Sequence, residues 1–354
     1  MTKPLNFAVV GLGMGQHHCK AIARARGARL VAVCDVDEER LRPVAAQYEC
    51  KAYTEYEAML RDPGIDVVNI VTESGYHARM GMQAARAGKH LVMEKPVDIV
   101  PVRIKKLETA VAAAGVKCAC IFQSRMDACN IAIKKALDAG KLGKLIGLHG
   151  ALPWYRGPDY FAGIHGAWRA TWVIDGGGSL MNQGIHTLDL LIFFGGLVES
   201  VCAFYGVHNH DIEAEDQTVA CLRYANGALG ALYTTTCCVP EGAQTIYGYG
   251  TKGSFRTVGN RIDLYAMGTQ RERARMLARF GCGAGARVDA IAKDPMAVGT
   301  DGHLIIIEDL VRAIRENRDP IVPLSAARHA VEVACAIYKS GRTGKAARVI
   351  TDNR

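Results

Sequence analysis

A glycine-rich turn near the start of this chain constrains its fold more than any other feature. The run VVGLGMGQHH places Gly11, Gly13 and Gly15 between an apolar stretch and a helical pattern. In this context Gly11 permits a tight turn, Gly13 lets the backbone approach a pyrophosphate, and Gly15 supplies a close helix–strand contact. The spacing is one residue tighter than G-x-G-x-x-G, and any tight βα turn shows glycines, so the turn alone identifies no ligand.

An acidic residue at the end of the next predicted strand strengthens the case for a dinucleotide. In LVAVCD, Asp35 lies 22 residues beyond Gly13, where a carboxylate accepts hydrogen bonds from an adenosine ribose. The same carboxylate repels a 2′-phosphate, so the sequence favours NAD over NADP, although Arg40 nearby would partly offset this. The alternative role for Asp35 is a cap at the start of a helix.

Residues 1–125 alternate short apolar runs with helical patterns, which predicts βαβ units and a parallel sheet. The predicted strands are Asn6–Val10, Arg29–Cys34, Val67–Val71, His90–Met93 and Lys117–Phe122. The predicted helices are Gln16–Arg26, Glu38–Gln47, Tyr56–Arg61, Ala78–Ala87 and Val100–Ala114. We therefore expect an α/β fold that begins with a Rossmann dinucleotide-binding domain.

Residues 126–354 have a different rhythm, with mostly strands and a few helices. The predicted strands are Leu145–Leu152, Val198–Val207, Thr218–Tyr224, Leu229–Thr236, Thr245–Gly250, Ser254–Val258 and Arg261–Ala266. The predicted helices are Asn130–Ala139, Ser179–Phe194, His303–Glu316 and Ala326–Ser340. Turn residues at 225–227 and 259–260 indicate hairpins. This pattern predicts a second α/β domain on an open, mostly antiparallel sheet, with a closing helix able to pack back on the first domain.

Composition excludes several classes of protein. Of 354 residues, 49% are hydrophobic and 22% charged, with a net charge of +8, which excludes a disordered or low-complexity chain. The most apolar stretch, Leu190–Val198, is far shorter than a membrane-spanning helix, and no signal peptide opens the chain. No nucleic-acid-binding module is recognisable in the basic segments. We expect a cytoplasmic protein.

The cysteines and histidines indicate no metal site and no disulfide framework. None of the 12 cysteines forms a C-x-x-C pair, and most lie in strand-like runs. His208 and His210 resemble a pair of metal ligands, but the sequence indicates no third ligand for them. We expect both to be exposed loop histidines.

Four segments carry a family resemblance. Asp62–Pro96, DPGIDVVNIVTESGYHARMGMQAARAGKHLVMEKP, ends in the tripeptide Glu94-Lys95-Pro96. Trp168–Leu191 reads WRATWVIDGGGSLMNQGIHTLDLL, and the chain closes with GHLIIIEDLVRAI and ARHAVEVACAIYKS. In this order they resemble the Gfo/Idh/MocA oxidoreductases, the glucose–fructose oxidoreductase and inositol dehydrogenase family. E-K-P is the signature of its first domain, and the second segment is similar to its substrate-domain motif.

The resemblance implies a cofactor site, and two departures bear on it. The implied cofactor-binding residues are Gly11, Gly13, Met14, Gly15, Asp35, Thr72, Ser74, His77, Glu94, Lys95 and Gln123. The family usually has Thr-Pro where this chain has Thr72-Glu73, and often Asp where it has Asn182. The version M-N-Q-x-I-H, with S-G-x-H at 74–77, is more like the UDP-N-acetylglucosaminuronate-type and related sugar dehydrogenases.

The predicted catalytic residues are Lys95, His186 and Asn182. Lys95 follows a strand at the sheet edge where ligands bind, and a lysine there hydrogen-bonds a substrate hydroxyl and its alkoxide; partial burial would lower its pKa. Asn182, His186 and Asp189 fall at i, i+4 and i+7 of the predicted helix. His186 is the candidate general base, Asn182 would orient the substrate or the imidazole, and Asp189 is predicted to be structural. A surface lysine and a structural histidine are the alternatives.

A loop rich in aromatic and arginine residues is the predicted substrate site. Aromatic faces pack on sugar C–H surfaces, and arginine pairs with carboxylates or phosphates. The candidates are Tyr155, Arg156, Tyr160, Trp168 and Arg169. We expect a carbohydrate substrate with an anionic group, a nicotinamide near Lys95 that Asn182 and His186 face, and, from the resemblance, a homodimer or homotetramer formed through the second sheet.

Three functions follow from these features. The first is an NAD-dependent dehydrogenase of a sugar, sugar nucleotide or polyol. The second is an enzyme that keeps NAD bound and uses transient oxidation for epimerisation, elimination or glycoside cleavage. The third is a non-catalytic NAD sensor or scaffold. The presence of Lys95 and His186 favours the two enzymes.

Overall fold

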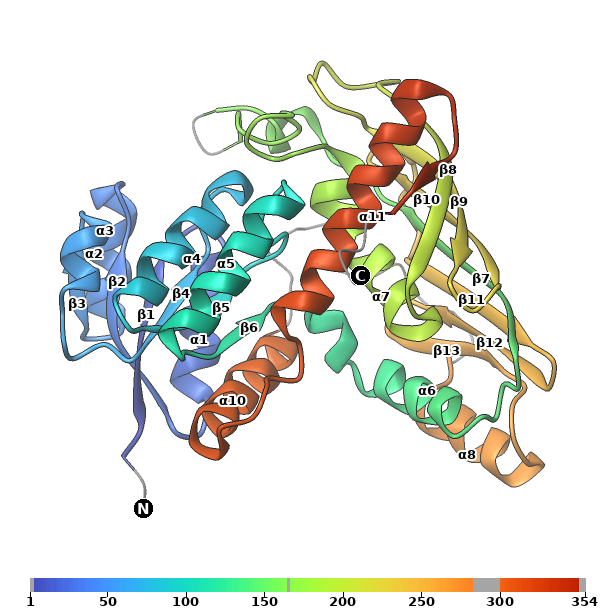
Figure 1. The fold of residues 1–354 in the computed structure, drawn as a ribbon, viewed down its shortest axis with the longest axis horizontal. Helices are drawn as coiled ribbons and strands as arrows, with labels where there is room; N and C mark the ends of the chain where they lie inside the picture. The colour runs from blue at the N-terminus through green and yellow to red at the C-terminus, as the bar shows by residue number, and fades with distance from the viewer. Residues whose placement is uncertain (1–2, 164–165, 283–299, 350–354) are drawn as a thin grey trace. The chain divides into compact units, whose positions relative to one another are not determined.

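The structure is a computed structural model that describes residues 3–163, 166–282 and 300–349. The chain divides into two compact units, each built on one sheet (Figure 1). The first unit comprises Met1–Gln123 and Val298–Arg328, and the second comprises Ser124–Ala297 and His329–Arg354. The sequence places residues 298–328 in the second domain, whereas this division groups them with the first.

The first unit contains a six-stranded parallel sheet with the order β3-β2-β1-β4-β5-β6. This strand order is that of dinucleotide-binding Rossmann domains, so the predicted fold is confirmed. Sequence patterns missed only β3, which has three residues and no buried position. The strands are β1 Leu5–Val10, β2 Ala28–Cys34, β3 Lys51–Tyr53, β4 Val67–Ile70, β5 His90–Met93 and β6 Cys118–Cys120.

Helices connect these strands. The sequence between consecutive strands has apolar residues at helical spacing, and residues that start and end a helix bound these segments. Gly115 follows the longest connecting helix in the left-handed region, at φ 65°, where a side chain would be strained. The helices are α1 Gly15–Arg24, α2 Glu38–Gln47, α3 Tyr56–Leu60, α4 His77–Arg86, α5 Pro101–Ala114 and the returning α10 Asp301–Glu316. The apolar face of α10 buries Ile306, Ile307 and Leu310 completely, and α10 packs against α1.

The second unit contains an eight-stranded sheet with the order β13-β12-β11-β7-β10-β9-β8-β14. Its pairs are antiparallel except β7 with β10, so the predicted mostly antiparallel sheet and both hairpins are confirmed. The strands are β7 Leu145–Pro153, β8 Val198–Gly206, β9 Gln217–Tyr224, β10 Leu229–Thr235, β11 Thr245–Gly250, β12 Gly253–Val258, β13 Arg261–Tyr265 and β14 Ala347–Arg348.

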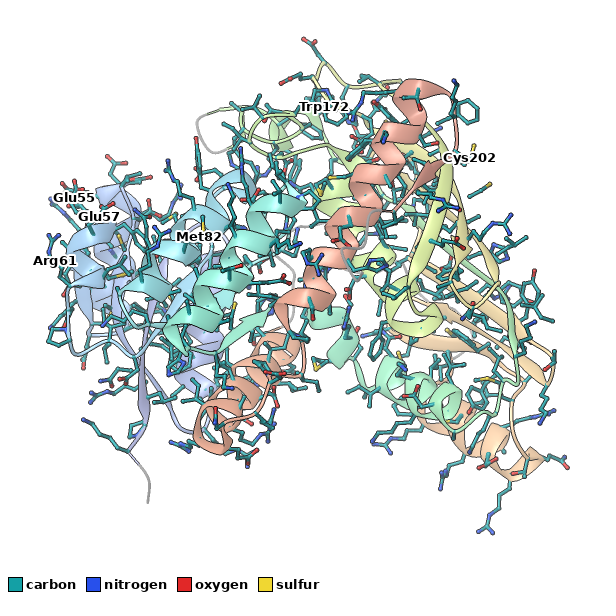
Figure 2. The ribbon with its side chains drawn as sticks, viewed as in Figure 1. Glu55, Glu57, Arg61, Met82, Trp172 and Cys202 are labelled. Atoms are coloured by element: carbon teal, nitrogen blue, oxygen red, sulfur yellow. The ribbon has the colours of Figure 1, made fainter. Side chains whose placement is uncertain are left out.

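One face of this second sheet is covered by a helix, and the other carries exposed side chains. A Cβ at Gly150 of β7 would lie 2.9 Å from Thr187 Cγ2, because helix α7 (Ile185–Gly195) packs directly on the strand. On the opposite face Cys202 of β8 points outward (Figure 2), and Phe204 beside it is 76% exposed. The predicted use of this face for assembly stays a prediction.

The predicted helix Ser179–Phe194 is wrong in its first part. Ser179–Gly184 forms a π-helical turn, and α-helix α7 begins only at Ile185. Glycine at position 184 permits β10 to approach this turn closely, because a Cβ there would lie 2.4 Å from Thr234 Cγ2. Single π turns occur often at functional sites. The i, i+4 relation that we predicted for Asn182 and His186 therefore does not hold as in a continuous α-helix.

The remaining helices are α6 Ala128–Asp138, α8 Gln270–Phe280 and α11 Leu324–Thr343. All 12 cysteines are free, as the sequence predicts. Among the described residues, each helix is too short or too polar to span a membrane.

Candidate functional site

The glycine-rich turn between β1 and α1 has the geometry that brings a backbone close to a phosphate. Gly11 has φ 85°, and a Cβ there would lie 2.5 Å from the carbonyl oxygen of Val71. A Cβ at Gly15 would meet Val9 Cγ1 at 3.0 Å, whereas the nearest atom to one at Gly13 is 3.9 Å away. Protein atoms therefore pack closely against the backbone at Gly11 and Gly15. At Gly13, beside the amino terminus of α1, they leave room for a ligand.

Asp35 is held at the end of β2 and faces the same turn. Its Oδ2 accepts a hydrogen bond from the backbone N–H of Leu12 at 2.7 Å, and its Oδ1 accepts one from the N–H of Asp37 at 3.0 Å. The helix cap is Asp37, which accepts from the N–H groups of Glu39 and Arg40. Arg40 Nη1 lies 3.5 Å from Asp35 Oδ2. The structure thus gives the capping role to Asp37 and leaves Asp35 beside the turn.

Two loops at the carboxyl edge of the first sheet are joined by His77. Its Nε2 lies 2.8 Å from the carbonyl oxygen of Thr72, and its Nδ1 lies 2.7 Å from that of Pro96. Lys95 is half-buried between β5 and Pro96. The ring of His77 therefore braces the segment that follows Lys95 against the loop after β4, and Ser74 is buried in that loop.

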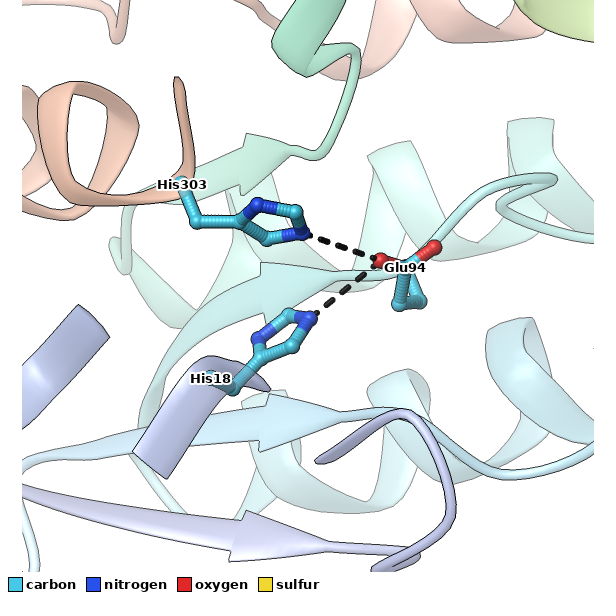
Figure 3. A group of neighbouring side chains, drawn as sticks. All are labelled: His18, Glu94 and His303. Atoms are coloured by element: carbon cyan, nitrogen blue, oxygen red, sulfur yellow. Dashed lines mark hydrogen bonds and ion pairs between the residues drawn. The ribbon is translucent and has the colours of Figure 1, made fainter. Parts of the chain in front are cut away.

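A buried network joins Glu94 to two histidines that the sequence analysis did not single out (Figure 3). Glu94 Oε1 lies 3.2 Å from His18 Nε2 and 3.6 Å from His303 Nε2, while Oε2 accepts the backbone N–H of Lys95 at 2.6 Å. Burial alone would raise the pKa of Glu94, but the histidine hydrogen bonds lower it well below its ordinary value. Asn69 Nδ2 donates to His18 Nδ1 at 2.9 Å, which leaves the proton on Nε2 to face Glu94.

This network fixes the backbone of the predicted catalytic lysine. Glu94 is anchored from α1 and α10, and it holds the N–H of the next residue, Lys95. His18 belongs to the motif VVGLGMGQHH, so its place in the sequence was a signal, but its partner His303 lies 285 residues away.

Two further predicted cofactor residues lie in the first unit. Met14 is the residue that precedes α1. Gln123 follows β6, and its Oε1 is buried without a hydrogen-bond partner among the described residues. A buried acceptor without a partner costs stability unless a ligand or water satisfies it. The predicted cofactor residues of this unit thus include Gly13 with space beside its backbone, the hydrogen-bonded carboxylate of Asp35, and the amide oxygen of Gln123 without a partner among the described residues.

In the second unit, Asn182 contacts a carboxylate that the sequence analysis did not identify. Its Nδ2 donates to both oxygens of Asp175, at 2.9 and 2.8 Å, and Asp175 is fully buried. The family often has Asp where this chain has Asn182, and here the carboxylate of Asp175 lies beside the amide instead. His186 lies in the first turn of α7 and is half-exposed.

Asp189 is structural, as predicted. Its carboxylate accepts two hydrogen bonds from the guanidinium of Arg125, from Nε at 2.7 Å and from Nη2 at 2.5 Å. Both side chains are buried, and the pair ties the residues before α6 to α7.

The predicted substrate loop forms a cluster of stacked cations and aromatic rings. The Arg169 guanidinium lies 4.3 Å from the centroid of the Tyr160 ring, and that of Arg156 lies 5.6 Å from it. Arg169 also lies 5.5 Å from the Trp168 ring. The Tyr160 hydroxyl accepts from Gln183 Nε2 at 2.6 Å, next to Asn182. The loop thus gathers Arg156, Tyr160 and Arg169 beside the π turn, and Tyr155 lies at its start.

Two family models match this chain. The model described as an oxidoreductase family with an NAD-binding Rossmann fold matches residues 5–122. The GFO/IDH/MocA C-terminal domain matches residues 131–256. Both models belong to one family, they occur in the expected order, and together they cover most of the chain.

Individual relatives agree with these matches. A scyllo-inositol 2-dehydrogenase (NAD(+)) of Bacillus subtilis is 27% identical, over 97% of this chain and 96% of its own length. The WlbA dehydrogenase of Bordetella pertussis, solved with NADH and UDP-GlcNAcA, is 29% identical with a TM-score of 0.85, covering 99% and 100% of the two chains. A levoglucosan dehydrogenase solved with NADH has a TM-score of 0.83 at 20% identity, over 99% and 100%, which shows a shared fold.

Proposed function

This chain belongs to the Gfo/Idh/MocA family of NAD-binding oxidoreductases, and we propose that it oxidises a secondary alcohol of a carbohydrate by hydride transfer to NAD. One observation carries the proposal. The turn at Gly11–Gly15 and the anchored Asp35 lie on a Rossmann sheet whose carboxyl edge also presents Lys95, held in place through Glu94. Lys95 is thus at the edge where such sheets bind dinucleotides and their substrates.

The residues that would hold NAD are those whose geometry fits it. The open backbone at Gly13 and the amino terminus of α1 suit the pyrophosphate, Asp35 suits the ribose, and the buried Oε1 of Gln123 offers an acceptor. When bound, NAD accepts the hydride. The exclusion of a 2′-phosphate by Asp35 supports NAD as the cofactor.

The protein residues have to bind the alcohol and remove its proton. The Lys95 ammonium would donate a hydrogen bond to the reacting hydroxyl and stabilise the alkoxide, and the imidazole of His186 would accept the proton. Asn182, polarised by the buried Asp175 carboxylate, would orient the substrate. One proton and one hydride thus leave the alcohol, which becomes a ketone.

The substrate that this chemistry suits best is a carbohydrate with an anionic group. Arg156 and Arg169 flank Tyr160, and a guanidinium recognises a carboxylate or a phosphate through paired hydrogen bonds. The similarity to WlbA, solved with UDP-GlcNAcA, supports a UDP-hexosaminuronate. The similarity to a scyllo-inositol dehydrogenase supports a cyclitol.

The test is NADH formation by the purified protein with NAD and four substrate classes: free sugars, polyols, glycosides and UDP-hexosaminuronates. We expect turnover with one class, and its loss in Lys95→Ala and His186→Ala. Lys106→Ala, on the exposed side of α5, and His208→Gln are the controls that keep activity. Turnover that survives in Lys95→Ala would refute the proposed chemistry.

The other two candidate functions predict different results. An enzyme that oxidises its substrate only transiently would retain NAD through purification, convert substrate to product and accumulate no NADH. A sensor or scaffold would bind NAD without converting any substrate. A cytoplasmic location and a homodimeric or homotetrameric assembly remain predictions from the sequence.

A further inference from the structure

A second cluster of chemically reactive side chains lies in the second unit, and none of its members is among the residues that the proposed reaction uses. It consists of His210 and Asp216, from the segment between β8 and β9, and Cys237, which follows β10. His210 Nδ1 lies 3.2 Å from Asp216 Oδ2 and 3.5 Å from Cys237 Sγ. From the sequence we expected His210 to be an exposed loop histidine, but its side chain is only 4% exposed.

The hydrogen bonds of His210 leave its second ring nitrogen, Nδ1, facing a carboxylate oxygen and a thiol. Its Nε2 lies 2.7 Å from the carbonyl oxygen of Arg156, which can only accept, so Nε2 carries a proton. In a neutral imidazole Nδ1 then presents a lone pair, directed at a carboxylate oxygen and a thiol sulfur. Three arrangements satisfy these atoms: the Cys237 thiol donates its S–H to Nδ1, a second proton on Nδ1 is donated to Asp216, or a metal ion binds all three atoms.

Asp216 is held by the backbone independently of His210's ring. Its Oδ1 accepts from the N–H of His208 at 2.9 Å, and its Oδ2 accepts from the N–H groups of Asn209 and His210 at 2.9 and 3.1 Å. The carboxylate is fully buried and its position is fixed. Such a preorganised ligand loses little conformational entropy when an ion binds.

The three ligand atoms lie within 4.8 Å of one another, and the two distances from His210 Nδ1 suit a tetrahedral ion. Zinc bonds of ordinary length separate a nitrogen and a sulfur ligand by about 3.6 Å, and a nitrogen and an oxygen ligand by about 3.4 Å. The observed separations are 3.5 and 3.2 Å. The bond from His210 Nε2 to a backbone carbonyl is the outer contact that metal-bound histidines make almost always.

We propose that His210 Nδ1, Asp216 Oδ2 and Cys237 Sγ bind one divalent transition-metal ion of the zinc class, with a fourth position open to water. Imidazole, carboxylate and thiolate together select such an ion over magnesium or calcium. The Cys237 proton passes to solvent on binding, so that one thiolate and one carboxylate balance the two charges of the ion. This inference does not depend on the proposed function.

The ion would brace the predicted substrate loop. The Arg156 carbonyl fixes the His210 ring, Tyr155 pairs with Cys237 in an isolated β-bridge, and the Phe161 ring lies 5.0 Å from His210. All three contacts come from residues 155–161. The sequence could not show this site, because its ligands are separated by up to 27 residues and follow no metal-binding spacing.

The test begins with the full-length protein stripped of metal by a chelator and titrated with Co²⁺. We expect one equivalent per chain to produce a thiolate-to-cobalt charge-transfer band, which Zn²⁺ abolishes by displacement. His210→Gln should bind at least tenfold more weakly, and Cys237→Ser should lose the band. His208→Gln and Cys238→Ser are the matched controls with unchanged binding, since Cys238 Sγ faces the Pro240 carbonyl oxygen instead.

A second measurement needs no variant and therefore does not depend on a variant's folding. Zinc should protect Cys237 of the wild-type protein from alkylation, measured by mass spectrometry, while Cys238 serves as the internal control. The absence of both the cobalt band and the protection would overturn the proposal. So would a band of equal strength in Cys237→Ser, or a His210 ring that is doubly protonated and insensitive to zinc, which would establish an ion pair with Asp216.

Discussion

The buried ion pair between Arg125 and Asp189 allows a quantitative prediction about the helix that carries His186. The side chains of Arg125 and Asp189 are 8% and 1% exposed and are joined by two hydrogen bonds of 2.7 and 2.5 Å. Asp189 lies one turn beyond His186 on α7, so the pair anchors this helix. The perturbation is a cycle of Arg125→Met, Asp189→Leu and the double variant.

The expected magnitudes follow from the burial of both charges. Each single variant leaves one charge buried without its partner, which costs about 3–5 kcal/mol of unfolding free energy. The double variant leaves no buried charge, and Met at position 125 still packs on the Phe193 ring, 5.2 Å from the Arg125 guanidinium. Its unfolding free energy should therefore lie within about 1–2 kcal/mol of the wild-type value. The coupling between the two positions is then at least about 4 kcal/mol.

Tryptophan fluorescence reports on the second unit, which contains Arg125 and Asp189. All three, Trp154, Trp168 and Trp172, lie in the second unit, and Trp172 (Figure 2) packs edge-on against Tyr338. Urea unfolding followed by tryptophan fluorescence therefore measures the stability of this unit. Single variants that cost less than 1 kcal/mol, or a double variant as unstable as the sum of the singles, would refute the reasoning.

Three further predictions concern the first unit. Gly11→Ala should weaken NADH binding at least tenfold, measured by fluorescence titration, because the added Cβ would lie 2.5 Å from a carbonyl oxygen. The control is Gly88→Ala, where φ is 73° and no atom lies within 4 Å of the added Cβ. It should cost about 1 kcal/mol of stability and leave the NADH affinity unchanged. Asp35→Ser should shift the NADH-to-NADPH affinity ratio toward NADPH at least tenfold, whereas Asp37→Ser, which keeps a capping hydroxyl, should leave the ratio unchanged. Hydrogen bonds, the strongest from Lys51, lower the pKa of Asp62 to about 2, so its stabilisation is present above pH 4 and is lost as the pH falls through 2. Asp62→Asn should therefore be less stable than wild type by about 1 kcal/mol at pH 7, a difference that shrinks below pH 4 and disappears below pH 2 in urea titrations.

Most of the fold could be predicted because its signals are local. The strands β5 and β11 and the helix α2 begin and end where the apolar and helical patterns do. Sequence patterns failed where tertiary contacts decide the conformation. The π turn at 179–184 lies against β10, which approaches Gly184 too closely for a side chain, and β3 pairs with β2.

Some residues of the candidate site could be predicted from the sequence, and others could not. The glycine turn, Asp35 and the E-K-P segment could be identified from sequence, because each is a short motif at the end of a strand. His303, Asp175 and Asp216 could not. His303 and Asp175 lie in segments that carry the family resemblance, but nothing in those segments shows that they contact Glu94 and Asn182, and no motif surrounds Asp216.

The sequence by itself determined the class of fold, the parallel sheet with its dinucleotide turn, and the family, because periodicity and short motifs record which side chains face a core or a ligand. Only the tertiary structure decided which buried partners hold the key residues. Glu94 pairs with His18 and His303, and His210 pairs with Cys237, across distant segments of the chain, while Asn182 contacts Asp175, seven residues before it. A hydrogen bond or an ion pair depends on distances of about 3 Å in space, and separation along the chain does not encode them.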